Sequence, residues 1–87
     1  MSAAGMLSTR RDPSMREYLH RTRDLIDRAV KDGDRDALRD AENATARAVV
    51  HTVMYGGGHL HELAEVSIRA KEGLNLVIAR QIMGAEQ

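Results

Sequence analysis

The stretch VVHTVMYGGGHLHEL, residues 49–63, decides the fold that we expect for this chain. Its three consecutive glycines, Gly56 to Gly58, interrupt any helix, because glycine loses more conformational freedom on folding than any other residue. On both sides of the glycines, apolar residues recur at spacings of three and four, which is the period of an amphipathic helix. The stretch therefore predicts an antiparallel helical hairpin, with helices over about residues 34–55 and 59–83.

A third apolar stripe precedes the hairpin and predicts another helix over about residues 13–31. Asp12 is a favourable N-cap residue, and Pro13 suits the first helical turn, where a missing N–H costs nothing. Residues 1–11 carry no helical period, so we expect a flexible N-terminal arm followed by a single helical domain over residues 12–87. The predicted fold class is all-α, with three helices.

Other glycines mark further positions along these helices. Gly33 suits the left-handed exit from the first helix, and Asp34 offers a carboxylate that caps the second. Gly73 lies inside the third segment, where glycine costs a helix up to about 1 kcal/mol relative to alanine. It therefore predicts a kink or a break at that point.

The composition limits the classes of protein to which this chain can belong. Its 87 residues include no Cys, Phe or Trp, and the lack of cysteine excludes disulfides, thiol nucleophiles and thiolate metal sites. Thirteen basic residues balance thirteen acidic ones, so no net charge draws the chain to nucleic acid or to an anionic membrane. The apolar runs are too short for a membrane span or a signal peptide, and we expect a cytoplasmic protein that does not bind membranes.

The second half of the chain has more apolar surface than three short helices can cover. Residues 49–54 carry a broad apolar band, and residues 74–83 are apolar around most of a helical circumference. Because a helix of the latter kind must be surrounded, we expect a second copy of the chain and a homodimeric helical bundle. The predicted interface with that copy, or with another protein, comprises Val49, Val50, Val53, Met54, Leu74, Leu76, Val77, Ile78, Ile82 and Met83.

These features favour a non-enzymatic protein-interaction module that works as an adaptor, an inhibitor or an assembly component. None of the serines follows a strand in the setting of a nucleophilic serine. The neighbouring carboxylates Asp40 and Glu42 point to different helical faces, so they do not form an acid–base pair. We therefore expect no catalytic residue and no cofactor.

A first alternative is a dimeric nucleic-acid-associated regulator. The N-terminal part of the chain is its most basic region, and arginine exceeds lysine by eleven to two, which favours bidentate contacts with phosphate. In a dimer, the arginines of two chains would add to one another. The candidate residues are Arg10, Arg11, Arg16, Arg21 and Arg23.

A second alternative is a metal-binding bundle with its site at the tip of the hairpin. Imidazole and carboxylate groups are good ligands for zinc, iron or manganese, and several of them flank the triple glycine. The simpler interpretation is that they are solvated residues whose carboxylates complement the start of a helix. The candidate ligands are His51, His59, His61, Glu62 and Glu65.

Overall fold

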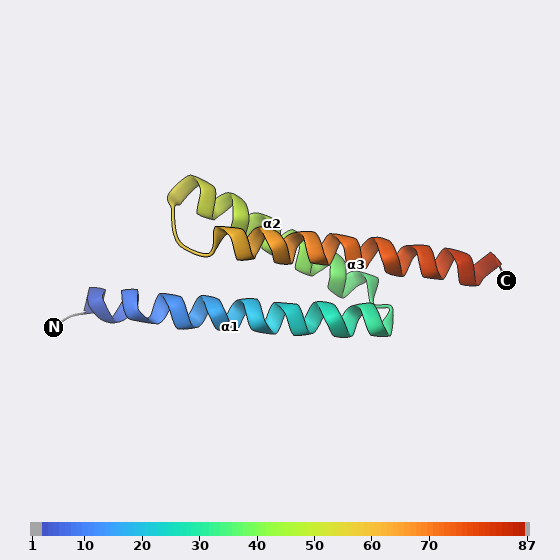
Figure 1. Cartoon of the computed structure of the whole chain (residues 1–87), viewed down its shortest axis with the longest axis horizontal. Helices are drawn as coiled ribbons and strands as arrows, with labels where there is room; N and C mark the ends of the chain where they lie inside the picture. The colour runs from blue at the N-terminus through green and yellow to red at the C-terminus, as the bar shows by residue number, and fades with distance from the viewer. Residues whose placement is uncertain (1–2, 87) are drawn as a thin grey trace.

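Three helices pack into one bundle in the computed structural model, which describes the backbone of residues 3–86 and the side chains of residues 14–84. The helices are α1 (Ala3–Asp32), α2 (Arg35–Tyr55) and α3 (Leu60–Glu86). α2 runs antiparallel to both of its neighbours, so α1 and α3 run in the same direction (Figure 1). The all-α class and the packing of three helices are confirmed.

The start of α1 differs from the prediction. The helix begins at Ala3 instead of Pro13 and continues through Asp12 and Pro13, so Asp12 is not its N-cap. Residues 3–11 are therefore helical where we expected an arm outside the helix, and residues 1–2 lie outside the described residues. The physical reason is that the alanine, methionine, leucine and arginine residues of this segment have a high intrinsic helix propensity. The spacing of apolar residues indicates which side of a helix is buried, but it does not indicate the intrinsic helix propensity of a segment.

The turn between α1 and α2 is closed by the residues that the sequence indicated. Gly33 has a left-handed φ of 72°. The Gly33 N–H donates to the carbonyl oxygen of Val30, and the Asp34 N–H donates to the carbonyl oxygen of Ala29. These two hydrogen bonds form a Schellman motif. Asp34 then caps α2, because its Oδ1 accepts a hydrogen bond from the Ala37 N–H at 3.1 Å. Both predictions for this turn are confirmed.

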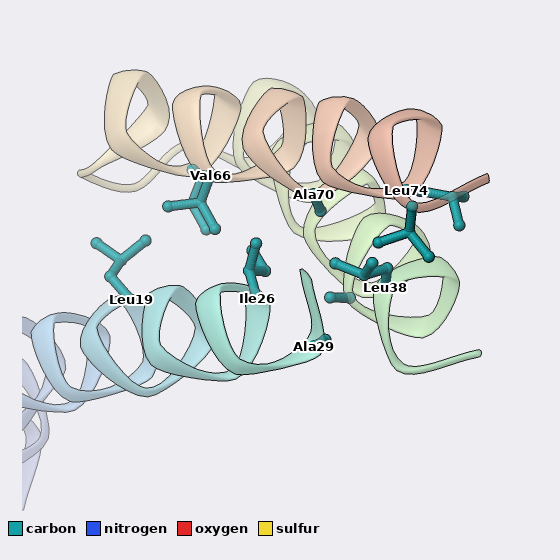
Figure 2. Packing of buried hydrophobic residues seen from close by; sticks show 10 residues of the cluster. Leu19, Ile26, Ala29, Leu38, Val66, Ala70 and Leu74 are labelled. Carbon is teal, nitrogen blue, oxygen red and sulfur yellow. The ribbon is translucent and has the colours of Figure 1, made fainter. Parts of the chain in front are cut away.

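The hydrophobic core lies between all three helices, and successive members on one helix are three, four or seven residues apart. Figure 2 shows side chains of α1 and α3 pointing toward each other, with Leu38 of α2 beside them. Thr45 is the buried polar side chain of the described residues, and its hydroxyl donates to the Ala41 carbonyl oxygen at 2.7 Å. The buried apolar residues are Leu19, Ile26, Ala29, Leu38, Ala41, Leu63, Val66, Ala70, Leu74 and Val77.

Gly73 neither kinks nor breaks α3, which is continuous from Leu60 to Glu86. The glycine is buried where all three helices meet. A Cβ atom on Gly73 would lie 2.7 Å from Cγ2 of Val30 on α1 and 3.4 Å from Cδ2 of Leu38 on α2. The predicted kink was wrong because close packing, and not backbone freedom, requires a glycine at this position.

The bundle is elongated, with principal extents of 64 × 22 × 16 Å. The first part of α1 extends past the hairpin tip, and the last part of α3 extends past the α1–α2 turn at the opposite end (Figure 1). A hydrogen bond of 3.1 Å from Gln81 Nε2 to the carbonyl oxygen of Gly33 marks the level at which α3 passes that turn. Among the described residues, no helix is both long enough and apolar enough to cross a membrane.

Candidate functional site

The residues of the predicted interface differ widely in burial. Leu74 and Val77 are only 8% and 1% exposed, because α1 and α2 of the same chain already cover that side of α3, so neither is available to a second chain. Val49 and Ile78 are half-buried and pack against the core. The remaining six are exposed: Val50, Val53, Met54, Leu76, Ile82 and Met83.

Within one chain, the other helices leave part of the segment 74–83 uncovered. Leu76 is 45% exposed and borders a groove that it shares with Ile26 and Val30 of α1. Ile82 and Met83 are 55% and 62% exposed and directly follow Gln81, which bonds to Gly33 in the α1–α2 turn. Past this turn α3 continues alone (Figure 1). These last two side chains are bare because the other helices end before they reach them.

An exposed apolar strip runs along the hairpin near its tip. Its α2 members follow one another at spacings of four and three, and its α3 members at a spacing of four, so each set lies on one line of its helix. The four large side chains of the strip are between 40% and 66% exposed. We call this surface the hairpin strip; it consists of Ala46, Val50 and Val53 of α2 and Leu60, Ala64 and Ile68 of α3.

On α3, the hairpin strip is directed away from α1. Arg69 and Gly73 lie on the side of α3 that meets α1. Arg69 forms an ion pair of 3.1 Å with Asp27, and Gly73 packs against Val30. Successive residues of a helix are rotated by about 100°, so Ile68 points well away from both. The line of the strip on α3 therefore lies on a side that α1 does not cover.

The same relation holds on α2. Thr52 and Tyr55 face α1, since they line a cleft together with Tyr18. Val50 and Val53 lie on the far side of the helix from them, beyond the seam between α2 and α3. The strip residues of the two helices thus border this seam from both sides and form one surface opposite α1.

Four members of this surface, Ala46, Leu60, Ala64 and Ile68, are absent from the interface that the sequence predicts. Leu60, Ala64 and Ile68 are spaced four residues apart, so the second stripe is visible in the sequence. Periodicity alone does not tell which of two adjacent apolar stripes will meet the other helices.

Charged side chains border the hairpin strip on both of its helices. On α2, Arg39 continues the line of the strip and Arg47 borders it; both are exposed, and neither forms an ion pair within the described residues. On α3, Glu72 continues the line and Glu65 borders it, with a contact of 3.9 Å between Glu65 and His61. Asp40 is exposed on the same line of α2 as Arg47, and Lys71 is exposed one turn after Ile68 on α3, so both margins of the strip carry charges of both signs.

An open cleft of about 750 Å³ lies between α1 and the hairpin tip. Both tyrosines of the chain, Tyr18 and Tyr55, line it together with His51, His59 and the three tip glycines. The rings of His51 and Tyr55 lie with their centroids 4.8 Å apart. The space is open because glycines have no side chains to fill it at the point where α2 ends.

His59 begins α3 from an unusual backbone conformation, with a φ of 68°. Its carbonyl oxygen accepts the first hydrogen bond of α3 from the Leu63 N–H at 2.9 Å, and its Nδ1 lies 3.3 Å from Oε2 of Glu62. The pKa of the Glu62 carboxyl falls below its usual value of 4.5, first because its own backbone N–H donates to it and then because of the His59 side chain. The Glu62 carboxylate therefore interacts favourably with the N-terminal end of α3.

The structure separates the five candidate metal ligands into local pairs. His59 lies beside Glu62, His61 lies beside Glu65, and His51 contacts a tyrosine instead. Within the part of the chain that the structure describes, no three His, Asp or Glu side chains are grouped so that they could hold a metal ion. The ligands do not form one set, because neighbours on the same helix meet more readily than residues across the open tip.

The candidate nucleic-acid residues do not form one patch on α1 within the described side chains. Arg16 and Arg23 are seven residues apart and share one side of the helix. Arg21 lies on another side and forms an ion pair of 3.3 Å with Glu17. The side chains of Arg10 and Arg11, the other two candidates, lie outside the described residues.

No protein-family model matches the chain, and neither a curated protein nor a solved structure matches it. The geometry and charges of the hairpin strip are therefore the basis on which a function is inferred.

Proposed function

We propose that this chain is a non-enzymatic helical protein-interaction module that forms a homodimer through the hairpin strip and serves another protein as an adaptor, an inhibitor or an assembly component. The observation that carries the proposal is the position of the strip. Val50, Val53, Leu60 and Ile68 are exposed on one surface opposite α1. Exposed apolar patches of this kind mark interaction sites, because leaving them in water has a cost that association removes.

The accessible surface of the chain supports self-association. It amounts to 6441 Å², whereas a compact monomer of 9.6 kDa exposes about 5,100 Å². The excess of about 1,300 Å² exceeds the roughly 800 Å² that each partner contributes to a standard interface. The two extended helix ends account for part of the excess, and the hairpin strip supplies the apolar part that a partner would cover.

The character of the strip favours a protein partner over nucleic acid. Phosphate recognition requires several cations on one surface, and the arginines of α1 whose side chains the structure describes are distributed over different sides of that helix. The hairpin strip is instead an apolar centre with charged margins, which is the arrangement typical of protein–protein interfaces.

Sedimentation equilibrium over micromolar to millimolar concentrations tests the proposal. We expect the wild-type chain to approach twice its mass of 9.6 kDa, and we expect Val50→Asp and Ile68→Asp to remain monomeric, because each buries a carboxylate in the interface. Leu25→Asp is the matched control, since Leu25 is 43% exposed on α1 and outside the strip. Far-UV circular dichroism confirms that each variant is helical.

Two outcomes would contradict the proposal. If the wild-type chain stays monomeric throughout this concentration range, the hairpin strip is not a dimer interface. A wild-type dimer that Leu25→Asp disrupts, while the two strip variants leave it intact, places the interface elsewhere on the molecule.

A further inference from the structure

We infer that the cleft between α1 and the hairpin tip is a binding site for a small, neutral, planar heteroaromatic molecule with hydrogen-bond acceptors on its edge. The inference goes beyond the proposed function, because Thr52 and Tyr55 line the cleft on the side of α2 that faces α1, away from the hairpin strip. The volume of the cleft, about 750 Å³, lies within the range of small-molecule sites. The cleft and the strip are therefore tested separately.

The aromatic side chains of the chain are concentrated at this cleft. The sequence contains two tyrosines and four histidines, and no Phe or Trp. Both tyrosines and two of the histidines line the cleft, and they come from both of its walls. Because aromatic rings stack on flat partners, this lining favours a planar aromatic ligand. The four rings are Tyr18 of α1, His51 and Tyr55 of α2, and His59 next to the tip glycines.

Contacts within the chain hold these rings in place. On one wall, Tyr18 is half-buried and packs against the hydrophobic core. On the other wall, the ring centroids of His51 and Tyr55 lie 4.8 Å apart. Nδ1 of His59 lies 3.3 Å from Oε2 of Glu62. A ligand therefore meets rings whose freedom is already restricted, which lowers the entropic cost of binding.

The tip glycines supply hydrogen-bond donors to the same cleft. Gly57 and Gly58 line it, and within the described residues their backbone N–H groups donate to no other group. Backbone N–H groups require acceptors, and a carbonyl oxygen or ring nitrogen on the edge of a heteroaromatic ligand is one. Because glycine has no side chain, such an edge can approach the backbone closely.

The charge of the lining favours a neutral ligand. Among the described side chains that line the cleft, none belongs to Asp, Glu, Lys or Arg. An ionised ligand would leave water without meeting an opposite charge, which has a high free-energy cost. Riboflavin and adenosine are suitable probes, because each combines a neutral planar ring system with acceptors on its edge.

Aromatic ¹H–¹³C NMR spectroscopy tests the inference, since the two tyrosines and four histidines give the aromatic signals of the chain. At least one of the two probes should shift the signals of the four rings that line the cleft. The signals of His20 and His61, which lie outside the cleft, should stay unchanged. Ribose, which has no aromatic ring, should shift none of the six. Adenosine monophosphate should bind no more tightly than adenosine.

Variants of the lining give the second measurement. Tyr18→Leu and Tyr55→Leu should each weaken binding of the probe about five- to a hundredfold, because each removes a surface on which the ligand stacks. His20→Leu is the matched control, since it removes an exposed ring from α1 outside the cleft, and it should leave the affinity unchanged. Far-UV circular dichroism confirms that each variant is helical.

The outcomes for the cleft are independent of the oligomeric state. Val50→Asp, which changes the hairpin strip, should bind the probe as the wild type does. The inference is wrong if neither probe shifts the cleft rings at millimolar concentration, if His20 and His61 shift equally, or if both tyrosine variants bind like the wild type. Sedimentation equilibrium decides the proposed function separately.

Discussion

The two halves of α2 show opposite relations between apolar character and burial. The first half, Arg35–Thr45, carries Leu38, Ala41 and Thr45, all of them buried. The second half, from Ala46 to Tyr55, carries four large aliphatic side chains, yet none of its residues is fully buried. Burial along this helix therefore follows the presence of neighbours and not the apolar content of the segment.

The difference has a structural cause at each end of the bundle. At the first half, the α1–α2 turn is short and capped, and Gly73 lets α3 approach both other helices closely. At the second half, α2 ends in three glycines that open a cleft toward α1. The hairpin strip lies near the open end, on the face of the hairpin that α1 does not cover, while Ile82 and Met83 are exposed at the other end, where α3 continues alone.

The largest expected effect comes from truncating one large side chain in each half. Leu38→Ala should lower the free energy of unfolding by about 2–5 kcal/mol, because Leu38 is fully buried and its loss leaves a cavity. Val53→Ala, at 66% exposure, should change it by no more than about 0.5 kcal/mol in the monomer. Urea unfolding at concentrations below dimer formation measures both, and equal losses at the two positions would abolish the contrast between the halves.

A smaller effect should follow from adding a side chain at Gly73, where α3 packs closely against the other two helices. Gly73→Ala should destabilise the chain by about 1–2 kcal/mol, since a new methyl group would lie 2.7 Å from Val30 and overpacking outweighs the gain in helix propensity. The double variant with Val30→Ala has room for the methyl group. Its loss of stability should therefore be smaller than the sum of the losses of the two single variants. A stabilised Gly73→Ala single variant would show that the helices separate there at little cost.

The smallest effect concerns the open half, where α3 begins. The depressed pKa of Glu62 means that its carboxylate stabilises the fold above its usual pKa of 4.5, and that this contribution disappears as the pH falls through the lower folded value. Glu62→Gln should therefore lower Tm slightly at neutral pH and leave it unchanged at strongly acidic pH. Thermal unfolding followed by circular dichroism between these conditions measures the difference. A Tm difference that grows as the pH falls would contradict the sign.

Much of the fold follows from local features of the sequence. Gly33 and Asp34 predict a turn that the structure contains, and the triple glycine predicts the end of α2, because these residues act on the backbone within one helical turn. The start of α1 was predicted wrongly for a related reason. A helix that lies outside the packed region needs only propensity, so residues 3–11 show no apolar period to detect.

The candidate site was predictable only in part. Val50, Val53 and Met54 were expected to be surplus apolar residues, and they are exposed. Leu74 and Val77 had the same apolar character but are covered by the chain itself, while Ile68 belongs to the exposed strip and was not predicted. These residues differ in the direction in which they point from α3, and no property of the amino acids themselves reveals it.

The sequence by itself determined the number of helices, the turn between the first two and the presence of more apolar surface than one small chain can cover, because these depend on local backbone preferences and on composition. Only the tertiary structure decided which apolar residues stay uncovered. The physical reason is that burial depends on how helices are rotated and placed against one another, and those relations join residues far apart in the chain.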